Sequence, residues 1–268
     1  DGGGSGILNG SETSGVMSII GDSKTFILQN LLLQNGKNSD GDGGGLFISG
    51  TNTIKLNNCT IKNCTASANG GGIYIADGSV TLTGSTIQNC TAESNGGGIY
   101  IADGSVRLDK CVIGRNLGTD VAAITATIGG TYPDSSTPYT NNAQNGGGIY
   151  VDSGSLTLKN ETHVGYNYAS ADGGGIYHGG GSITFSSIAV SGKIPVTAAY
   201  VSGNAAGSNG GGVYTVGISP IDPFITDSYI GYNRSGENGG AIYKAGTGNL
   251  SVVSNVGDMI ISNNEAAS

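Results

Sequence analysis

The sequence predicts an all-β protein that forms one right-handed parallel β-helix, a β-solenoid of about 26 residues per turn with loop insertions. The first observation is a motif of three small residues, an aliphatic residue and an aromatic residue, which occurs seven times. Its aromatic residues are Phe47, Tyr74, Tyr100, Tyr150, Tyr177, Tyr214 and Tyr243. Most of them follow one another at a nearly constant interval, and a few intervals are longer, which is typical of a solenoid whose turns carry inserted loops. The second observation is that short runs with period-two alternation dominate, and no stretch has a helical apolar period.

A second motif keeps a fixed distance from the first. It consists of an aliphatic residue, two variable residues and Asn, and two early copies have Cys in place of Asn. The predicted stacked column is Cys64, Cys90, Asn116, Asn167, Asn204, Asn233 and Asn264. From five of these residues the next small-residue triplet begins six positions later, which indicates one turn geometry. We expect each Asn amide to bond to its neighbours in the column or to the turn backbone, as in other stacked β structures.

Residues 70–96 illustrate one predicted turn. Its first strand places Ile73 inside and Tyr74 outside, because side chains alternate along a strand. After a bend, a second strand over 79–82 contributes another inward pair, and a third strand around Ile87 closes the turn. We therefore expect three strands per turn. The coil should be right-handed, because parallel β crossovers almost always have that hand.

Three interruptions of the period predict insertions within this single repeat domain, which spans residues 1–268. They are placed near 117–141, 186–197 and 216–227. Loops on a rigid scaffold are where binding specificity is usually found.

Composition limits the function classes. Gly contributes 51 of 268 residues and recurs at fixed places, which favours tight turns over a disordered linker. The net charge of −8 and the absence of a basic patch argue against nucleic-acid binding. No apolar run approaches the ~20 residues of a spanning helix, so we expect no direct membrane insertion. No signal peptide is recognisable at the start, so we expect a mature or excised piece of a larger protein.

The low-charge composition, rich in Ser, Thr, Asn and Gly, suits an extracellular protein. Asn-x-Ser/Thr sequons occur at Asn58, Asn63, Asn89, Asn160, Asn233 and Asn249. These sequons fit two interpretations. Asn and Thr are common in solenoid turns, and exposed Asn residues of a glycosylated protein would be acceptors.

Polysaccharide-cleaving activity is the enzymatic alternative, because many parallel β-helices cleave polysaccharides with carboxylates that converge in a groove. Here the outward positions of the first strand carry aromatic residues and no acid, and Asp77 and Asp103 lie in Asp-Gly turns. The two histidines, His163 and His178, have no obvious partner set. The segment Asp40-Gly41-Asp42-Gly43 fits either a cation site or a Gly-rich turn. We expect no catalytic residue, no bound metal and no cofactor.

The outward aromatic column is the candidate binding site, and two interpretations of it stay open. The seven aromatics, stacked one strand spacing apart, could simply stabilise one another. They could also form a strip that binds sugars or a partner chain, since exposed contiguous aromatics often mark interaction sites.

The four cysteines predict buried thiols. Cys64 and Cys90 occupy adjacent turns at a Cα separation of ~4.8 Å, which permits a disulfide, but their parallel Cβ vectors disfavour one. Cys59 and Cys111 share another column two turns apart, which is too far to bridge. The spacings do not suggest a zinc site.

The two motifs resemble those of the polymorphic outer-membrane (Pmp-like) repeats, in which Gly-Gly-Ala-aliphatic motifs alternate with Phe-x-x-Asn motifs. Gly239-Gly240-Ala241-Ile242 is closest to the family form, whereas the second motif has Ile or Val where the family prefers Phe. Such repeats occur in the passenger domains of autotransporter adhesins and in similar surface proteins. The resemblance covers essentially the whole chain and implies a surface-exposed β-helix concerned with adhesion or assembly.

We therefore expect a non-catalytic, extracellular or cell-surface, adhesin-like protein. Its expected partner is a glycan or protein on a host or neighbouring cell. One alternative is a filament subunit that stacks head to tail with itself, because Asn264 joined to Gly2 would preserve the six-residue step. The other alternative is a polysaccharide-active enzyme.

Overall fold

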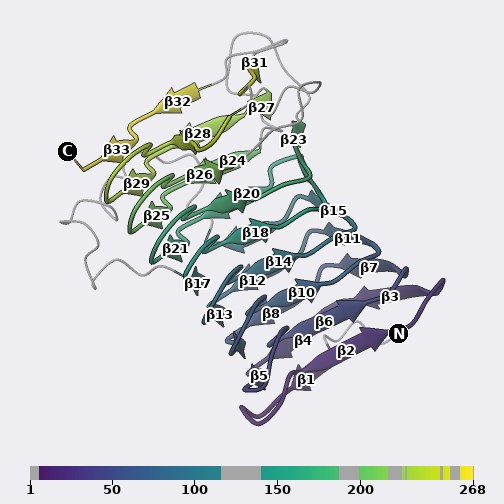
Figure 1. Ribbon diagram of the computed structural model, residues 1–268. Coiled ribbons are helices and arrows are strands. Elements are labelled where there is room, and N and C mark those ends of the chain that lie inside the picture. Colours follow the sequence, from purple (N-terminus) through teal and green to yellow (C-terminus); the bar gives the residue numbers. More distant parts are fainter. Residues whose placement is uncertain are drawn as a thin grey trace.

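The chain winds through four parallel β-sheets in most of its turns, and successive turns stack along one axis (Figure 1). The computed structural model describes residues 6–115, 140–186, 199–216, 225–226, 228–247, 250–253 and 260–267. Every strand pair within these residues is parallel, and each strand pairs with its equivalents in the turns before and after it. This arrangement is the predicted β-solenoid.

The four sheets are numbered here in the order in which a turn passes through them. Sheet 1 contains β2 (Met17–Ile20), β6 (Leu46–Ser49), β10 (Ile73–Ile75), β14 (Ile99–Ile101), β18 (Ile149–Val151), β22 (Ile176–His178), β26 (Val213–Thr215) and β30 (Ile242–Lys244). Sheet 2 contains β3 (Thr25–Gln29), β7 (Thr53–Asn57), β11 (Ser79–Thr83), β15 (Ser105–Asp109), β19 (Ser155–Lys159) and β23 (Ser182–Ser186).

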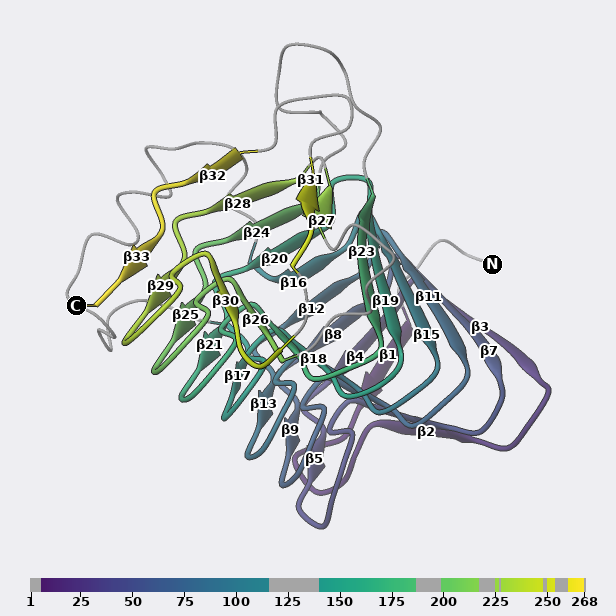
Figure 2. The ribbon, with the colours of Figure 1, turned by 45° about the horizontal axis from the view of Figure 1, so that its top comes forward.

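Sheet 3 is the longest, and sheet 4 consists of two-residue strands. Sheet 3 contains β1 (Gly6–Asn9), β4 (Leu31–Gln34), β8 (Thr60–Lys62), β12 (Thr86–Gln88), β16 (Val112–Gly114), β20 (His163–Gly165), β24 (Tyr200–Ser202), β28 (Tyr229–Gly231) and β32 (Ile260–Ser262). Sheet 4 contains β5 (Lys37–Asn38), β9 (Thr65–Ala66), β13 (Thr91–Ala92), β17 (Asn142–Ala143), β21 (Tyr168–Ala169), β25 (Ala205–Ala206), β29 (Arg234–Ser235) and β33 (Glu265–Ala266). A separate pair joins β27 (Ile225–Thr226) and β31 (Val252–Val253). Figure 2 shows sheet 4 along one edge of the coil and sheet 2 on the other side.

The prediction of three strands per turn was wrong, because sheet 4 adds a fourth. Its strands lie inside the six-residue step between the Asn/Cys column and the small-residue triplet. For example, Thr91 and Ala92 pair with Thr65 and Ala66. A strand of two residues is too short to show an alternating pattern, so the sequence indicated only a plain turn at this step.

The core consists of columns of aliphatic side chains, as predicted. One column on sheet 1 contains Leu46, Ile73, Ile99, Ile149, Ile176 and Val213, all fully buried, and ends at the partly buried Ile242. One column on sheet 2 contains Ile54, Val80, Val106, Leu156 and Ile183. Burial of apolar surface stabilises the fold by roughly 25 cal/mol per Å², and each turn buries its aliphatic residues only against its neighbours.

The polar column inside the coil has one member that differs from the prediction. Asn116 lies outside the described residues, and Asn141 holds the place between Cys90 and Asn167. The Cys90 backbone N–H donates to Asn141 Oδ1 at 3.0 Å, and Asn141 Nδ2 donates to Asn167 Oδ1 at 2.9 Å. The next triplet begins at Gly146, one position earlier than the six-residue step predicts, so this step is not constant. Asn116 and Asn141 flank the longest insertion, and only the pairing of β17 with β13 decides between them.

The predicted insertions fall mainly outside the described residues. Of the segment 117–141, residues 140 and 141 are described, and both belong to the coil. Most of 186–197 and 216–227 likewise lies outside the described part of the chain.

Four of the sequon asparagines have a structural reason in their backbone conformation. Asn58, Asn63, Asn89 and Asn160 have φ values of 51°, 55°, 54° and 41°, and they form the corners on either side of sheet 3. Asn adopts this left-handed conformation more readily than other residues with a side chain. The turn interpretation therefore accounts for these four residues.

The small-residue triplet is required by the close approach of the turns. Gly70 has a φ of +67°, in the left-handed region. A Cβ on Gly71 would collide with the backbone of Thr91, and a Cβ on Gly72 would lie 2.5 Å from the Gly98 carbonyl oxygen. Both collisions are with backbone of the next turn and cannot be relieved by a rotamer change.

We predict that Gly71→Ala lowers the free energy of unfolding by at least ~2 kcal/mol, because the new methyl group overpacks a rigid backbone contact. Urea denaturation measures this. Gly41→Ala is the matched control, since a Cβ there meets nothing within 4 Å. Equal effects of the two substitutions would contradict the steric explanation.

We also predict that Asn204→Leu destabilises the protein by ~3 kcal/mol or more, because leucine leaves several buried groups unsatisfied at ~1–3 kcal/mol each. Asn204 Nδ2 donates to the Val164 carbonyl at 2.9 Å and to Asn233 Oδ1 at 3.0 Å. Asn204 Oδ1 accepts from Asn167 N and Nδ2 at 3.0 and 2.9 Å. Urea denaturation again provides the measurement.

Asn238→Leu, at an exposed position, is the control for this variant and should cost less than ~1 kcal/mol. A similarly small effect at Asn204 would show that the buried column contributes little.

Candidate binding surface

The predicted aromatic column forms a continuous stack on the outer face of sheet 1, here called the tyrosine face. Its members are Phe47, Tyr74, Tyr100, Tyr150, Tyr177, Tyr214 and Tyr243. Successive ring centroids are 5.3, 5.3, 5.1, 4.5, 4.7 and 5.4 Å apart, and the rings of all but the last two pairs are within 10° of parallel. The seven side chains are half-buried. The register of sheet 1 therefore brings together aromatic residues from distant parts of the sequence.

Stacking limits how the tyrosine face can bind. The flat faces of the inner rings are covered by the neighbouring rings, whose centroids lie 5.3 and 5.1 Å away on either side of Tyr100. A sugar ring therefore cannot stack on them. What remains accessible is the ring edge and the phenol hydroxyl, which both donates and accepts hydrogen bonds. The surface thus offers a row of polar groups repeated once per turn.

A lane of small residues runs beside the rings. The position two residues after the aromatic is occupied in five successive turns by Ser49, Ala76, Ala102, Asp152 and Gly179. Asp152 is the charged member of this lane and is exposed. A ligand in this lane would contact the tyrosine edges from the side.

Nearby carboxylates raise the pKa of several tyrosines of the stack. Burial and then the Asp152 carboxylate raise the pKa of Tyr100. Burial followed by Asp42 and Asp152 raises the pKa of Tyr74, and burial followed by Asp172 raises the pKa of Tyr214. The phenols therefore stay protonated and able to donate hydrogen bonds at neutral pH.

A second polar ladder, which the sequence analysis missed, lies at the position just before each triplet. Its members are Asp42, Asn69, Asn95, Asn145, Asp172, Asn209 and Asn238. Three of the six contacts between neighbours are amide-to-amide hydrogen bonds, at 3.0 to 3.1 Å, such as Asn95 Nδ2 to Asn69 Oδ1 and Asn145 Nδ2 to Asn95 Oδ1. The signal was present in the sequence, since Asn or Asp precedes every copy of the triplet.

The hydrogen bonds of this ladder give Asp42 a structural role. Its Oδ1 accepts from the backbone N and from Nδ2 of Asn69 at 2.9 and 3.0 Å. This supports the turn interpretation of the segment Asp40-Gly41-Asp42-Gly43. No group of three or more His, Cys, Asp or Glu residues suited to a metal ion occurs within the described part of the chain.

The two histidines have aromatic or polar partners that the sequence did not reveal. On the outer face of sheet 3, the His163 ring stacks on Tyr200 with centroids 4.4 Å apart, and Tyr200 contacts Tyr229 at 5.9 Å. All three side chains are buried. His178 instead points into the coil, where its Nδ1 lies 3.0 Å from Thr215 Oγ1. Burial lowers the pKa of both histidines, to about 4 for His163.

All four cysteines are free and buried, as predicted. Cys64 and Cys90 stack in adjacent turns, where a side-chain hydrogen bond with Cys90 lowers the pKa of Cys64 and burial raises that of Cys90. Ser85 lies between Cys59 and Cys111 in their column, and the Cys59 N–H donates to Ser85 Oγ at 3.0 Å.

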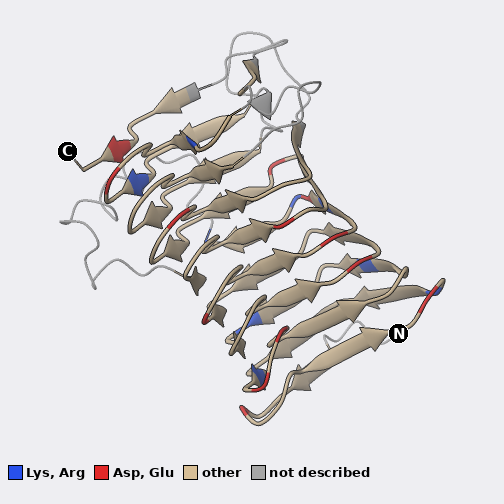
Figure 3. Cartoon of the chain, in the orientation of Figure 1, with Lys and Arg blue, Asp and Glu red and all other residues tan. Residues whose placement is uncertain are grey.

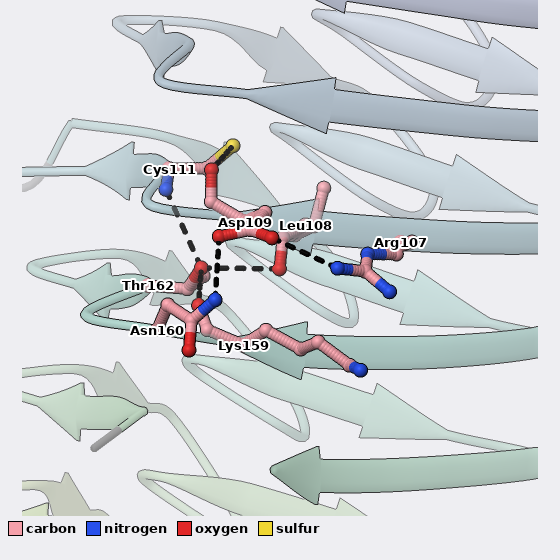
Figure 4. Close-up of polar contacts among 7 residues, drawn as sticks. All are labelled: Arg107, Leu108, Asp109, Cys111, Lys159, Asn160 and Thr162. Carbon is pink, nitrogen blue, oxygen red and sulfur yellow. Dashed lines mark hydrogen bonds and ion pairs between the residues drawn. The ribbon is translucent and has the colours of Figure 1, made fainter. Parts of the chain in front are cut away.

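Figure 4 shows the corner that continues this column one turn further. The Cys111 N–H donates to Thr162 Oγ1 at 3.3 Å, and Asp109 accepts from Arg107 and Asn160, both at 2.9 Å. Burial raises the pKa of Asp109, but these two contacts outweigh it and hold the pKa below its usual value. The polar groups of these residues form hydrogen bonds with one another, which indicates that the corner has a structural role.

Charges are sparse on the strands, which are mostly tan in Figure 3. In the described residues the two ion pairs are Arg107–Asp109 and Arg234–Glu265. No helix long and apolar enough to cross a bilayer is present in the described ranges.

Comparison with protein families agrees with this geometry. Residues 14–190, more than half of the chain, match the family model of the right handed beta helix region. The chain belongs to this family of right-handed β-helices. The match confirms the predicted fold class and its hand. No curated protein and no solved structure matches the chain. The finer resemblance to Pmp-like repeats stays a prediction.

We predict that the right-handed β-helix loses stability in acid through His163. Above about pH 6.5 both folded and unfolded states hold a neutral imidazole. As the pH falls from 6.5 toward about 4, the unfolded state binds the proton more readily, so stability decreases. At ~1.4 kcal/mol per pKa unit, the full loss is ~3 kcal/mol.

Urea denaturation at about pH 7 and about pH 4.5 checks this prediction. His163→Tyr is the matched variant, because it keeps an aromatic ring against Tyr200 without a group that titrates between about pH 4.5 and about pH 7. This variant should lose less stability in acid than the original protein. The contribution of His178 to that loss should be the same in both proteins. An unchanged difference between the two pH values would contradict the assignment to His163.

Proposed function

We propose that this right-handed β-helix is a non-catalytic, extracellular or cell-surface, adhesin-like protein that binds a glycan-bearing surface through the tyrosine face. The observation that carries the proposal is the stack of seven outward, half-buried aromatic rings on sheet 1. Contiguous aromatic side chains on an outer surface often mark interaction sites.

The contrast with the other sheets supports the choice of this face. The corresponding central column on the outer face of sheet 2 contains no aromatic residue; its members are Ile27, Lys55, Thr81, Arg107, Thr157 and Thr184. The aromatic residues on sheet 3, Tyr200 and Tyr229, are buried and cannot contact a ligand directly. On sheet 1 the hydroxyl edges remain accessible and are held in fixed register by the core columns beneath them.

The stack also contributes to stability, since each cross-strand aromatic pair is worth ~0.2–1 kcal/mol. An alanine substitution would therefore mix a loss of binding with a loss of stacking. Phenylalanine separates the two, because it keeps the ring and removes only the hydroxyl.

We predict that the double variant Tyr100→Phe and Tyr150→Phe binds its glycan at least ~5-fold more weakly, at an unchanged melting temperature. Two lost hydrogen bonds at ~0.5–1.5 kcal/mol each give an effect of this size. A glycan array identifies the ligands, and titration of the strongest of them measures the affinity of each variant.

Thr81→Val with Thr157→Val is the control, because it removes two hydroxyls from the outer face of sheet 2. It should leave binding unchanged. Equal affinity of the phenylalanine variant and the original protein would contradict the proposal and favour a purely structural stack. Analysis of the bound glycans for cleavage products addresses the enzymatic alternative, which predicts shortened chains.

A further inference from the structure

The charge beside the tyrosine face has one sign. The carboxylates of Asp42, Asp152 and Asp172 raise the pKa of tyrosines in the stack, and no Lys or Arg lowers it. Neither of the two ion pairs of the described residues involves these three carboxylates. The face therefore carries negative charge that no basic side chain of the described residues neutralises through an ion pair.

The hydrogen-bonding groups of the same surface are rich in acceptors. Asp42 and Asp172 each use Oδ1 to accept from the following Asn of the ladder, at 2.9 to 3.0 Å. Asp152 lies exposed in the lane of small residues, beside Tyr100 and Tyr150. A complementary ligand must bring hydrogen-bond donors and positive charge to the edge of the stack.

A ligand that meets all three carboxylates must be extended. Asp42 belongs to the turn of Phe47, Asp152 to the turn of Tyr150 and Asp172 to the turn of Tyr177. The Phe47 and Tyr150 turns are three strand steps apart, about 14 Å at ~4.8 Å per step. A monosaccharide cannot span this length, whereas a chain lying parallel to the coil axis can.

The ring geometry favours a carbohydrate over a peptide as that chain. Peptide-binding surfaces usually provide apolar pockets for side chains. Here the ring faces are covered by one another, and the accessible groups are hydroxyls, amides and carboxylates. These groups match the hydroxyls of a sugar chain.

On these grounds, and resting on the proposed function above, we propose that the tyrosine face binds an extended polysaccharide that carries free amino groups, with ammonium groups against Asp152 and, in other turns, Asp42 and Asp172. Charge complementarity fixes where along the stack such a chain lies, and the phenol row bonds to its hydroxyls.

The test compares three six-residue oligosaccharides with the same β-1,4 linkage: a glucosamine hexamer, the fully N-acetylated hexamer, and a neutral glucose hexamer. Binding is measured by titration calorimetry at about pH 6. We expect the amine-bearing hexamer to bind at least ~10-fold more tightly than the other two, and its affinity to fall as salt rises.

Asp152→Asn isolates the charge, because it keeps the size of the side chain. This variant should bind the glucosamine hexamer ~10-fold more weakly and the N-acetylated hexamer unchanged. Glu161→Gln is the matched control, since Glu161 is an exposed carboxylate at a corner between sheets 2 and 3. It should bind like the original protein.

The outcomes separate this inference from the proposed function. Equal binding of all three hexamers, weakened by the phenylalanine double variant, would overturn the amine preference and leave the glycan-binding function standing. Binding of a lysine hexapeptide as tightly as the glucosamine hexamer would overturn the choice of a carbohydrate. Absence of binding to any of these probes would overturn the inference, while the glycan array would still decide the proposed function.

Discussion

The constraint on which the whole structure depends is the superposition of successive turns at one strand spacing, ~4.8 Å. Each strand residue of an inner turn lies directly between its equivalents in the turns on either side, so each column must consist of side chains that fit against copies of themselves. Aliphatic residues satisfy this in the core, amides satisfy it in the buried Asn column, and flat rings satisfy it on the tyrosine face. The glycines of the triplets satisfy it by having no side chain, because the backbone of the next turn occupies the space where a Cβ would lie.

Departures from the columns show where the constraint is relaxed. Cys64 and Cys90 replace Asn near the start of the column and are accommodated beneath the triplet, 3.2 to 3.4 Å from the places where Cβ atoms of Gly45 and Gly72 would lie. On sheet 1 the aliphatic column containing Val151 continues as His178 and Thr215, which bond to each other inside the coil. The column then ends at Lys244, whose Nζ donates to three backbone carbonyls at 2.8 to 3.3 Å. In this column the polar side chains are satisfied by each other or by the local backbone.

The same constraint shapes the proposed binding surface. Stacking covers the ring faces and leaves a row of hydroxyl edges, so the tyrosine face is a polar surface despite its aromatic composition. The carboxylates of Asp42, Asp152 and Asp172 add a negative charge to that row. A rigid coil holds these groups in fixed register, and binding therefore requires little ordering of the protein, which favours affinity.

The sequence by itself determined the all-β class, the solenoid period, the inward aliphatic columns, the outward aromatic column and the buried thiols. These follow from residue spacing alone, because a constant period repeated along the chain leaves one way to stack Ile73 on Ile99 and Tyr74 on Tyr100. Only the tertiary structure decided that Asn141 joins the polar column, since the pairing of β17 across the longest insertion leaves no local signal. It alone also placed the His163 ring on Tyr200 and Asp152 beside Tyr100. These contacts lie between different turns, and which residues meet there depends on the lengths of the insertions as well as on the period.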